Sequence, residues 1–286
     1  MFDHMKRSSR SIWSGLCGAG ALALVASALP AMAGGCGNSG AGFEEWLSQF
    51  SREAGSQGVS GQALAALGGV TYDPQVIRLD RGQHSFKLSF EAFYARRVND
   101  ALIRRGQRLI AANRATFDRI EKRYGVPPSI IASIWGLETN YGALGSNMSI
   151  IRSLATLAYD CRRSAFFHTE LISALKIVQR GDMSPAQLRG GWAGEIGQTQ
   201  FLASAYYKYA VDFDGDGRRD LIHSVPDMLA STGNYLRSYG WQPGQPWTAG
   251  SANYNVLREW NKAEVYVKTI SVMAAKMETA SRAASN

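Results

Sequence analysis

One glutamate in the sequence stands among large apolar side chains. If residues 129–142 begin as a helix, Glu138 lies one turn from Ile134 and Trp135. A carboxylate in such surroundings is poorly hydrated, so its acid form is favoured and its pKa is raised. An acid that keeps its proton near neutral pH can protonate a glycosidic oxygen. From spacing alone, a glutamate at the wet edge of the helix is the more frequent explanation.

An acidic loop is the second group of residues that could do chemistry. Asp212, Asp214 and Asp216 are spaced like ligand positions 1, 3 and 5 of a calcium loop. The backbone carbonyl of Arg218 follows as position 7. Position 12 is His223, a poor ligand for a hard cation, so an ordinary EF-hand is not predicted. Three carboxylates this close repel one another, which favours a bound cation over an empty Asp/Gly turn.

The elements that must position these residues are predicted to be helices. Apolar side chains recur at helical spacing over residues 43–50, and Pro127 and Pro128 suit the first turn of the helix that carries Glu138. Convincing hairpin signals and internal repeats are absent, so we predict a mainly α fold with little β structure. Further helical regions are predicted at residues 62–67, 90–124, 150–159, 164–180, 204–209, 225–239 and 255–280.

Composition limits the classes of protein to consider. The 286 residues are 45% hydrophobic and 19% charged, which excludes global disorder and a multi-span membrane protein. The formal net charge of +8 favours an anionic partner. The basic residues are spread along the chain, however, so a nucleic-acid patch is not predicted.

The N-terminus has the order of a secretory signal. In residues 1–33, bases precede an apolar stretch that ends in the small residues Ala31 and Ala33. We expect cleavage after Ala33, a Gly-rich leader over residues 34–42, and no membrane span in the mature chain; an uncleaved anchor is the alternative.

Export leaves two cysteines, Cys36 and Cys161. An even pair in an oxidising compartment most simply forms one disulfide. Lipidation of Cys36 is the alternative, but the preceding residues lack the leucine of a lipoprotein signal.

Several motifs in fixed order resemble the lytic murein transglycosylase B family. They are residues 138–142, 190–201, 209–217, 234–236 and 259–266. The resemblance covers residues 43–286. It implies a catalytic domain with a lysozyme-like core over residues 125–240, embellished by helices within residues 43–124 and 250–286.

The resemblance implies a periplasmic lyase that cleaves the β-1,4 bond between N-acetylmuramic acid and N-acetylglucosamine without water. Glu138 would protonate the leaving oxygen and then accept the proton of the C6 hydroxyl, which closes a 1,6-anhydro ring. We expect a monomer that acts on peptidoglycan glycan strands and needs no organic cofactor. A hydrolytic muramidase, a non-catalytic peptidoglycan-binding protein and a calcium sensor are the rival functions.

The resemblance also assigns ligand-binding residues. The calcium loop of the family is lengthened and ends on a later aspartate, a role that Asp227 fits, and the Ca²⁺ would be structural. Amides and aromatic faces suit sugar hydroxyls and pyranose rings. The residues it places along a sugar groove are Tyr141 beside the acid, Gln200, Tyr235, Asn261 and Tyr266.

Two positions depart from the family pattern. Glu195 stands where relatives usually have a small residue. At about 6.5–9.5 Å from Glu138 it could activate a water, although a solvated or loop-structuring glutamate is favoured. Gly191 stands where the family often carries a serine thought to contact the acid, so any such hydrogen bond must come from elsewhere.

Overall fold

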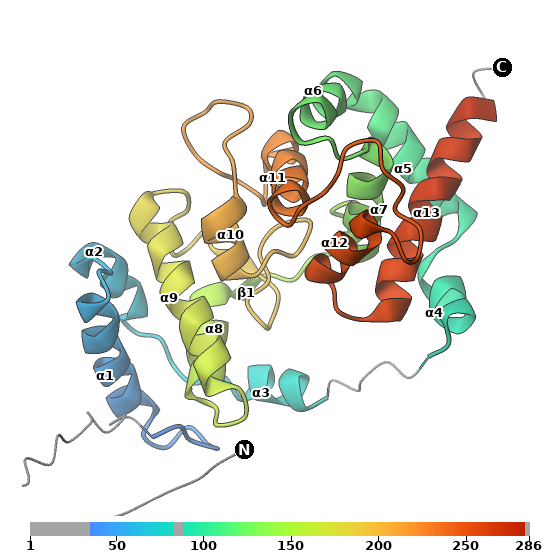
Figure 1. Cartoon of the computed structure of the whole chain (residues 1–286). Coiled ribbons are helices and arrows are strands. Elements are labelled where there is room, and N and C mark those ends of the chain that lie inside the picture. Colours follow the sequence, from blue (N-terminus) through green and yellow to red (C-terminus); the bar gives the residue numbers. More distant parts are fainter. Residues whose placement is uncertain (1–34, 83–87, 284–286) are drawn as a thin grey trace, which may run out of the picture. The chain divides into compact units, whose positions relative to one another are not determined.

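Helices make up nearly all the regular structure of the computed structural model, which describes residues 35–82 and 88–283 (Figure 1). The mainly α prediction is therefore confirmed, while the predicted signal, residues 1–33, lies outside the described residues. The elements are α1 (Phe43–Ser56), α2 (Gly61–Leu64), the 3-10 turn η1 (Ala65–Leu67), α3 (Pro74–Arg81), α4 (Phe90–Arg97), α5 (Asp100–Ala112), α6 (Arg114–Tyr124), α7 (Pro128–Thr139), β1 (Met148–Ser149), α8 (Ile150–Tyr159), α9 (Ser164–Arg180), β2 (Arg189–Gly190), α10 (Ala203–Tyr209), α11 (Val225–Ser238), α12 (Ala252–Trp260) and α13 (Glu264–Ala283).

The two longest predicted helical regions are broken in the structure. Residues 90–124 form three helices. The first break falls where Asn99 is extended and caps α5 by accepting the Leu102 N–H at 2.9 Å. The second falls at Asn113, whose side chain donates to the Leu109 carbonyl at 2.9 Å. Residues 255–280 are divided between α12 and α13. Asn261 is extended there, and its side chain accepts the Ala263 N–H at 2.9 Å, so the chain turns before α13 begins. Helix α3 was not predicted, although Asp73 caps its first turn.

Helix α7 is the centre of the packing. It contacts α5, α6, α11 and α13 (Figure 1). Every residue in it except Pro128 and Glu138 is buried. A helix that is apolar on all sides needs such complete burial. Tyr141 fills the space between α7 and α5, where a side chain at Gly136 or Gly106 would overlap its phenol ring or hydroxyl. The two glycines therefore permit the close approach of the helices.

The antiparallel pair β1 and β2 is the small sheet of the described chain. Met148 faces Gly190, which brings the start of the loop over residues 190–201 beside the segment that follows α7. An isolated bridge between Ile196 and Phe201 closes the same loop on itself. The loop is nearly 60 residues from the end of α7 in the sequence, and these pairings hold it close to that end in space.

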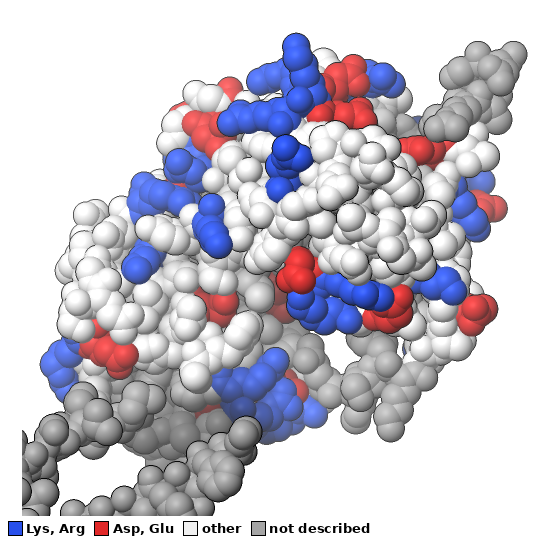
Figure 2. Space-filling view, viewed as in Figure 1, with Lys and Arg blue, Asp and Glu red and all other residues white. Residues whose placement is uncertain are grey.

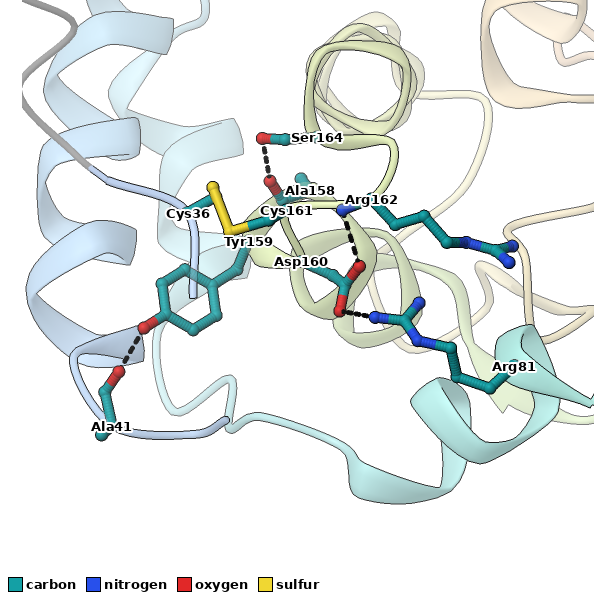
Figure 3. Close-up of a disulfide and its surroundings, with 9 residues drawn as sticks. All are labelled: Cys36, Ala41, Arg81, Ala158, Tyr159, Asp160, Cys161, Arg162 and Ser164. Atoms are coloured by element: carbon teal, nitrogen blue, oxygen red, sulfur yellow. Dashed lines mark hydrogen bonds and ion pairs between the residues drawn. A yellow bond between two sulfur atoms is a disulfide. The ribbon is translucent and has the colours of Figure 1, made fainter. Parts of the chain in front are cut away.

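A second group of helices surrounds α8 and α9, which pack along each other and contact α1 and α2 (Figure 1). Figure 3 shows how the start of the described chain is tied to this group. A disulfide joins Cys36 to Cys161, the Gly37 N–H donates to the Tyr159 carbonyl at 2.9 Å, and the Tyr159 hydroxyl donates to the Ala41 carbonyl. The disulfide predicted from export is present in the structure.

The described helices and the charged surface bear on whether the protein binds a membrane or a nucleic acid. None of the described helices is long and apolar enough to cross a bilayer. On the face drawn in Figure 2, lysines and arginines lie in separate groups with acidic side chains among them. This face therefore lacks the continuous basic stripe typical of nucleic-acid binding.

Replacing both Cys36 and Cys161 with serine is expected to lower the free energy of unfolding by about 2–5 kcal/mol, because the disulfide closes a long loop in the unfolded chain. Urea unfolding followed by circular dichroism measures the change. A reductant should destabilise the natural protein to the same extent and leave the double variant unaffected. An unchanged midpoint in the reduced natural protein would contradict the prediction.

Candidate active site

Glu138 occupies the last turn of α7, where the burial of the helix is interrupted. The helix ends immediately afterwards, because Asn140 and Tyr141 adopt left-handed conformations with φ of 50° and 57°. Two consecutive non-glycine residues in this region are strained, and such strain gathers at functional sites. Glu138 is half-buried and lines a cavity of about 590 Å³. A carboxyl group at this position can reach a ligand while most of its surroundings exclude water.

Two neutral donors hold one oxygen of the Glu138 carboxyl group. The Trp260 indole N–H donates to Oε1 at 3.0 Å, and the Tyr266 hydroxyl donates to the same atom at 2.7 Å. Trp260 ends α12 and Tyr266 lies in the first turn of α13, so the two donors stand on either side of the break in the predicted helix. No hydrogen bond from a described residue reaches Oε2, which leaves that oxygen available to a substrate.

Burial raises the pKa of Glu138, and this is the dominant effect on it. The hydrogen bonds from Trp260 and Tyr266 and the charge of Arg97 lower the pKa in part, while the charge of Glu195 raises it. Burial and the adjacent carboxylate also raise the pKa of Tyr266 well above the ordinary value of a tyrosine, so its hydroxyl remains a donor. Desolvation therefore favours the acid form of Glu138.

Gln198 connects α7 to the rest of the site. Its side-chain oxygen accepts the Trp135 indole N–H at 3.0 Å, and its backbone carbonyl accepts the Thr139 hydroxyl at 2.6 Å. Its side-chain nitrogen, Nε2, donates at 3.0 Å to the carbonyl of Ile222, just after the acidic loop. Gln198 thus holds both the middle and the end of α7 in a fixed relation to the following loops.

The structure brings one of the predicted groove residues, Tyr266, into contact with Glu138. Tyr141 and Tyr235 are buried, and their hydroxyls donate to the carbonyls of Leu102 and Glu259 at 3.0 and 2.7 Å. Neither tyrosine lines the cavity. Both rings pack edge-to-face against a tryptophan, Tyr141 against Trp135 and Tyr235 against Trp260.

The two predicted amide residues are half-buried and bond within their own turns. Gln200, with a left-handed φ of 54°, donates to the Gly197 carbonyl at 2.8 Å. Asn261 caps the turn before α13, as described above. Neither Trp260 nor Gln198 was singled out from the sequence. Both stand inside the motifs, but each is 60 or more residues from Glu138 in the sequence, so only the motifs pointed to them.

Glu195 is folded into its own loop. Its carboxylate accepts the Ala193 N–H at 3.0 Å, and its backbone carbonyl accepts the Gly191 N–H at 2.8 Å. A side chain at position 191 would overlap the Glu195 carboxylate, so glycine there and glutamate at 195 are mutually compatible. These contacts give Glu195 a role in structuring the loop, and burial raises its pKa.

The acidic loop brings three carboxylates together. Oxygens of Asp212, Asp214 and Asp227 all lie within 4.8 Å of one another. Asp227 is fully buried near the start of α11, and its carboxylate accepts the N–H groups of Phe213 at 2.7 Å and Asp220 at 2.9 Å. Three carboxylates at this distance, one of them removed from water, fit a hard divalent cation.

Two members of the predicted calcium set behave differently. Asp216 is exposed and is not in the group of three; its carboxylate accepts the Arg218 N–H at 2.8 Å. The guanidinium of Arg218 lies 3.6 Å from the same carboxylate. The buried Asp227, which the resemblance had assigned as the last ligand, completes the group.

Comparison with known families decides the class of the chain. The family model of the transglycosylase SLT domain matches residues 42–251. The chain belongs to this family.

Individual relatives agree with this assignment. The SLT-domain chain is 41% identical over 122 residues to membrane-bound lytic murein transglycosylase B of Escherichia coli K12; the match spans 42% of this chain and about a third, 34%, of that protein. SltB3 from Pseudomonas aeruginosa, in complex with NAG-anhNAM-pentapeptide, is 32% identical with a TM-score of 0.77, over 85% of this chain and 80% of that one.

A more distant structure shares the fold. The Escherichia coli lytic transglycosylase Slt35 in complex with calcium is 23% identical, with a TM-score of 0.73 over 82% of this chain and 93% of that one. The lysozyme-like, mainly α fold class predicted from the sequence is thereby confirmed.

The Glu138→Gln variant of the SLT-domain protein is expected to be more stable than the natural protein at neutral pH. The folded protein retains the Glu138 proton to a higher pH than the unfolded chain, whose carboxyl ionises near the ordinary value of 4.5. The free energy of unfolding of the natural protein therefore falls as the pH rises from the ordinary pKa towards the raised pKa of folded Glu138. A glutamine does not ionise, so the variant does not lose this stability.

Urea unfolding of both proteins at several pH values tests this expectation. The difference in stability should vanish below the ordinary pKa of a glutamate. Glu45→Gln, at an exposed position of α1, is the matched control and should change little. A Glu138→Gln protein that is less stable than the natural one at neutral pH would show that burial does not dominate.

Proposed function

We propose that the protein is a lytic transglycosylase that cleaves the β-1,4 bond between N-acetylmuramic acid and N-acetylglucosamine and forms 1,6-anhydro-N-acetylmuramic acid. The observation that carries this proposal is a half-buried carboxyl group on a cavity wall, with one oxygen held by two neutral donors. Membership of the SLT-domain family supports it. The name of the Escherichia coli relative and the ligand of SltB3 support peptidoglycan as the substrate.

In the first step Glu138 acts as a general acid. Its proton passes to the glycosidic oxygen, the bond from that oxygen to C1 of the muramyl residue breaks, and the N-acetylglucosamine end leaves as an alcohol. The muramyl N-acetyl group stabilises the oxocarbenium-like centre at C1. The Trp260 and Tyr266 donors stabilise the carboxylate that Glu138 becomes.

In the second step the same group acts as a general base. The Glu138 carboxylate accepts the proton of the muramyl C6 hydroxyl, and the C6 oxygen bonds to C1. The ring closure restores the acid form of Glu138, so no water is consumed and no second carboxylate is required. Because burial raises the pKa of Glu138, the protonated starting state is favoured for the next turnover.

The location and organisation of the protein are part of the proposal. We place it in the periplasm, exported by residues 1–33, as a monomer whose catalytic domain spans residues 43–286 around a core at 125–240. The disulfide supports an oxidising compartment. Gln200 and Asn261 are the amides that we propose for contacts with the sugar, since both are half-buried rather than fully enclosed.

Glu138→Gln is expected to lower the rate of anhydro-muropeptide formation from purified sacculi by at least about 10³-fold, because glutamine cannot donate the proton. Mass spectrometry of the digest measures anhydro and reducing ends separately. Binding to sacculi, followed by sedimentation, should be retained, and Glu45→Gln should behave like the natural protein.

The same digest separates the rival functions. Reducing muramyl ends in place of anhydro ends would identify a hydrolytic muramidase, and their loss in Glu195→Gln would assign the water-activating role to Glu195. A natural protein that binds sacculi but releases no product of either kind would identify a non-catalytic binding protein. Either result overturns the proposed reaction.

We infer that Asp212, Asp214 and Asp227 hold a structural Ca²⁺, with the Arg218 carbonyl as a further ligand. The closeness of the three carboxylates and the burial of Asp227 support this inference, as does the calcium complex of Slt35. The cation would neutralise the group and fix the segment to which Gln198 bonds. It takes no part in the chemistry at Glu138.

Calcium is expected to raise the melting temperature of the chelator-treated protein by roughly 5–10 °C, because a ligand bound only by the folded state stabilises it. Differential scanning calorimetry measures the shift. Asp227→Asn should abolish it, while Asp216→Asn, outside the group of three, should retain most of it. A large change in helix content on adding calcium would instead identify a calcium sensor.

A further inference from the structure

Gln198 is hydrogen-bonded to two parts of the protein that are far apart in the sequence. Its side-chain oxygen accepts the Trp135 indole N–H at 3.0 Å, and its backbone carbonyl accepts the Thr139 hydroxyl at 2.6 Å. Its backbone N–H and its side-chain Nε2 donate to the carbonyls of Leu221 and Ile222 at 3.1 and 3.0 Å. One residue therefore connects α7 to the segment that follows the acidic loop.

The two bonds to α7 lie on either side of Glu138. Trp135 precedes the glutamate by about one helical turn, and Thr139 follows it directly. Both of these side chains are buried, so water competes little for their hydrogen bonds. Because the last turn of α7 is held at two points, the direction in which the Glu138 side chain leaves the helix is fixed.

Two glycines leave room for this arrangement. A Cβ atom at Gly142 would lie 2.4 Å from the Gln198 side-chain oxygen, and a Cβ atom at Gly197 would lie 2.4 Å from the Leu221 carbonyl oxygen. Both glycines have a φ of 75°, which other residues rarely adopt. Gln198 thus occupies a closely fitted position, although it does not line the cavity of Glu138.

The segment to which Gln198 donates is itself held by the acidic loop. The buried carboxylate of Asp227 accepts the Asp220 N–H at 2.9 Å, and Ile222 lies two residues further along the chain. Hydrogen bonds and a short stretch of backbone therefore connect Asp227 through Gln198 to the turn that carries Glu138. A double-mutant cycle measures whether the two ends of such a connection are energetically coupled.

We propose that Gln198 is a positioning residue for Glu138 and that the acidic loop acts on catalysis through it. This inference rests on the proposed function and deepens it. One carboxyl group must reach the glycosidic oxygen and then the C6 hydroxyl, so a displacement of its helix affects both steps. Misplacing a catalytic group by about 1 Å lowers a rate by up to about 10²-fold. Because Gln198 lies outside the cavity, its contribution belongs to kcat and not to KM.

Gln198→Met tests the positioning role, because methionine has a similar length but no amide to bond to Trp135 and Ile222. The kinetics are measured on soluble glycan strands, from the anhydro ends detected by mass spectrometry. The value of kcat should fall about 10- to 100-fold, whereas KM should change little. Thr139→Val removes the other side-chain bond to Gln198 and should lower kcat in the same way, so the test also holds if Gln198→Met does not fold.

Gln179→Met is the matched control. Gln179 also joins two distant segments, since it accepts the Ser60 N–H at 2.8 Å and donates to the Gly58 carbonyl at 3.3 Å. These bonds tie α9 to the residues before α2, and their loss should leave kcat unchanged. Melting curves of every variant separate a change in kcat from partial unfolding.

A double-mutant cycle with Asp227→Asn tests the coupling to the acidic loop. The Asp227 carboxylate accepts the Phe213 and Asp220 N–H groups through different oxygens, and an asparagine retains only one accepting oxygen. Asp227→Asn alone should lower kcat, and it should add little to the loss already present in Gln198→Met.

An unchanged kcat in Gln198→Met or Thr139→Val overturns the positioning role, and so does a rise in KM alone or an equal loss of kcat in Gln179→Met. Losses of kcat that simply multiply in the double variant overturn the coupling to the acidic loop. The proposed function survives these outcomes, because the natural protein would still form anhydro ends. Failure of the proposed function is distinct, since the natural protein would then form none.

Discussion

Removing the Glu138 carboxyl group from water is the constraint on which the rest of the structure depends. The apolar side chains that bury α7 supply the desolvation, and Trp260 and Tyr266 offset part of its cost through one oxygen. Since neither donor carries a charge, the acid form remains favoured. Gln198 fixes the helix against the neighbouring loops, so the carboxyl group keeps this environment.

A second buried carboxylate shows how different partners give a different result. Asp80 is almost fully buried and pairs with Arg81, Arg162 and Arg163. Three guanidiniums on one carboxylate form a fixed ion-pair network, which is a structural role. The chain thus places cations directly on the carboxylate with a structural role and neutral donors directly on Glu138.

The sequence predicted local features better than distant ones. The bounds of α8 and α9 agree with the predicted ranges, because each helix buries an apolar face of its own. The break before α5 and the break before α13 occur at Asn99 and Asn261, whose side chains bond to the following turn, and helical periodicity does not reveal such contacts. The apolar surroundings of Glu138 could be read from its own helix, whereas the contact with Trp260 depends on tertiary packing. Tyr141 was expected beside the acid, but its ring fills a space between α7 and α5 that Gly136 and the distant Gly106 leave open.

Trp260 and Tyr266, which donate hydrogen bonds to Glu138, lie 122 and 128 positions after it in the chain. A polypeptide still emerging from the ribosome or the export channel would possess the carboxyl group long before its partners. A product truncated ahead of Trp260 would never acquire them. The hydrogen-bonded environment of Glu138 is thereby completed only when the last two helices, α12 and α13, pack against α7.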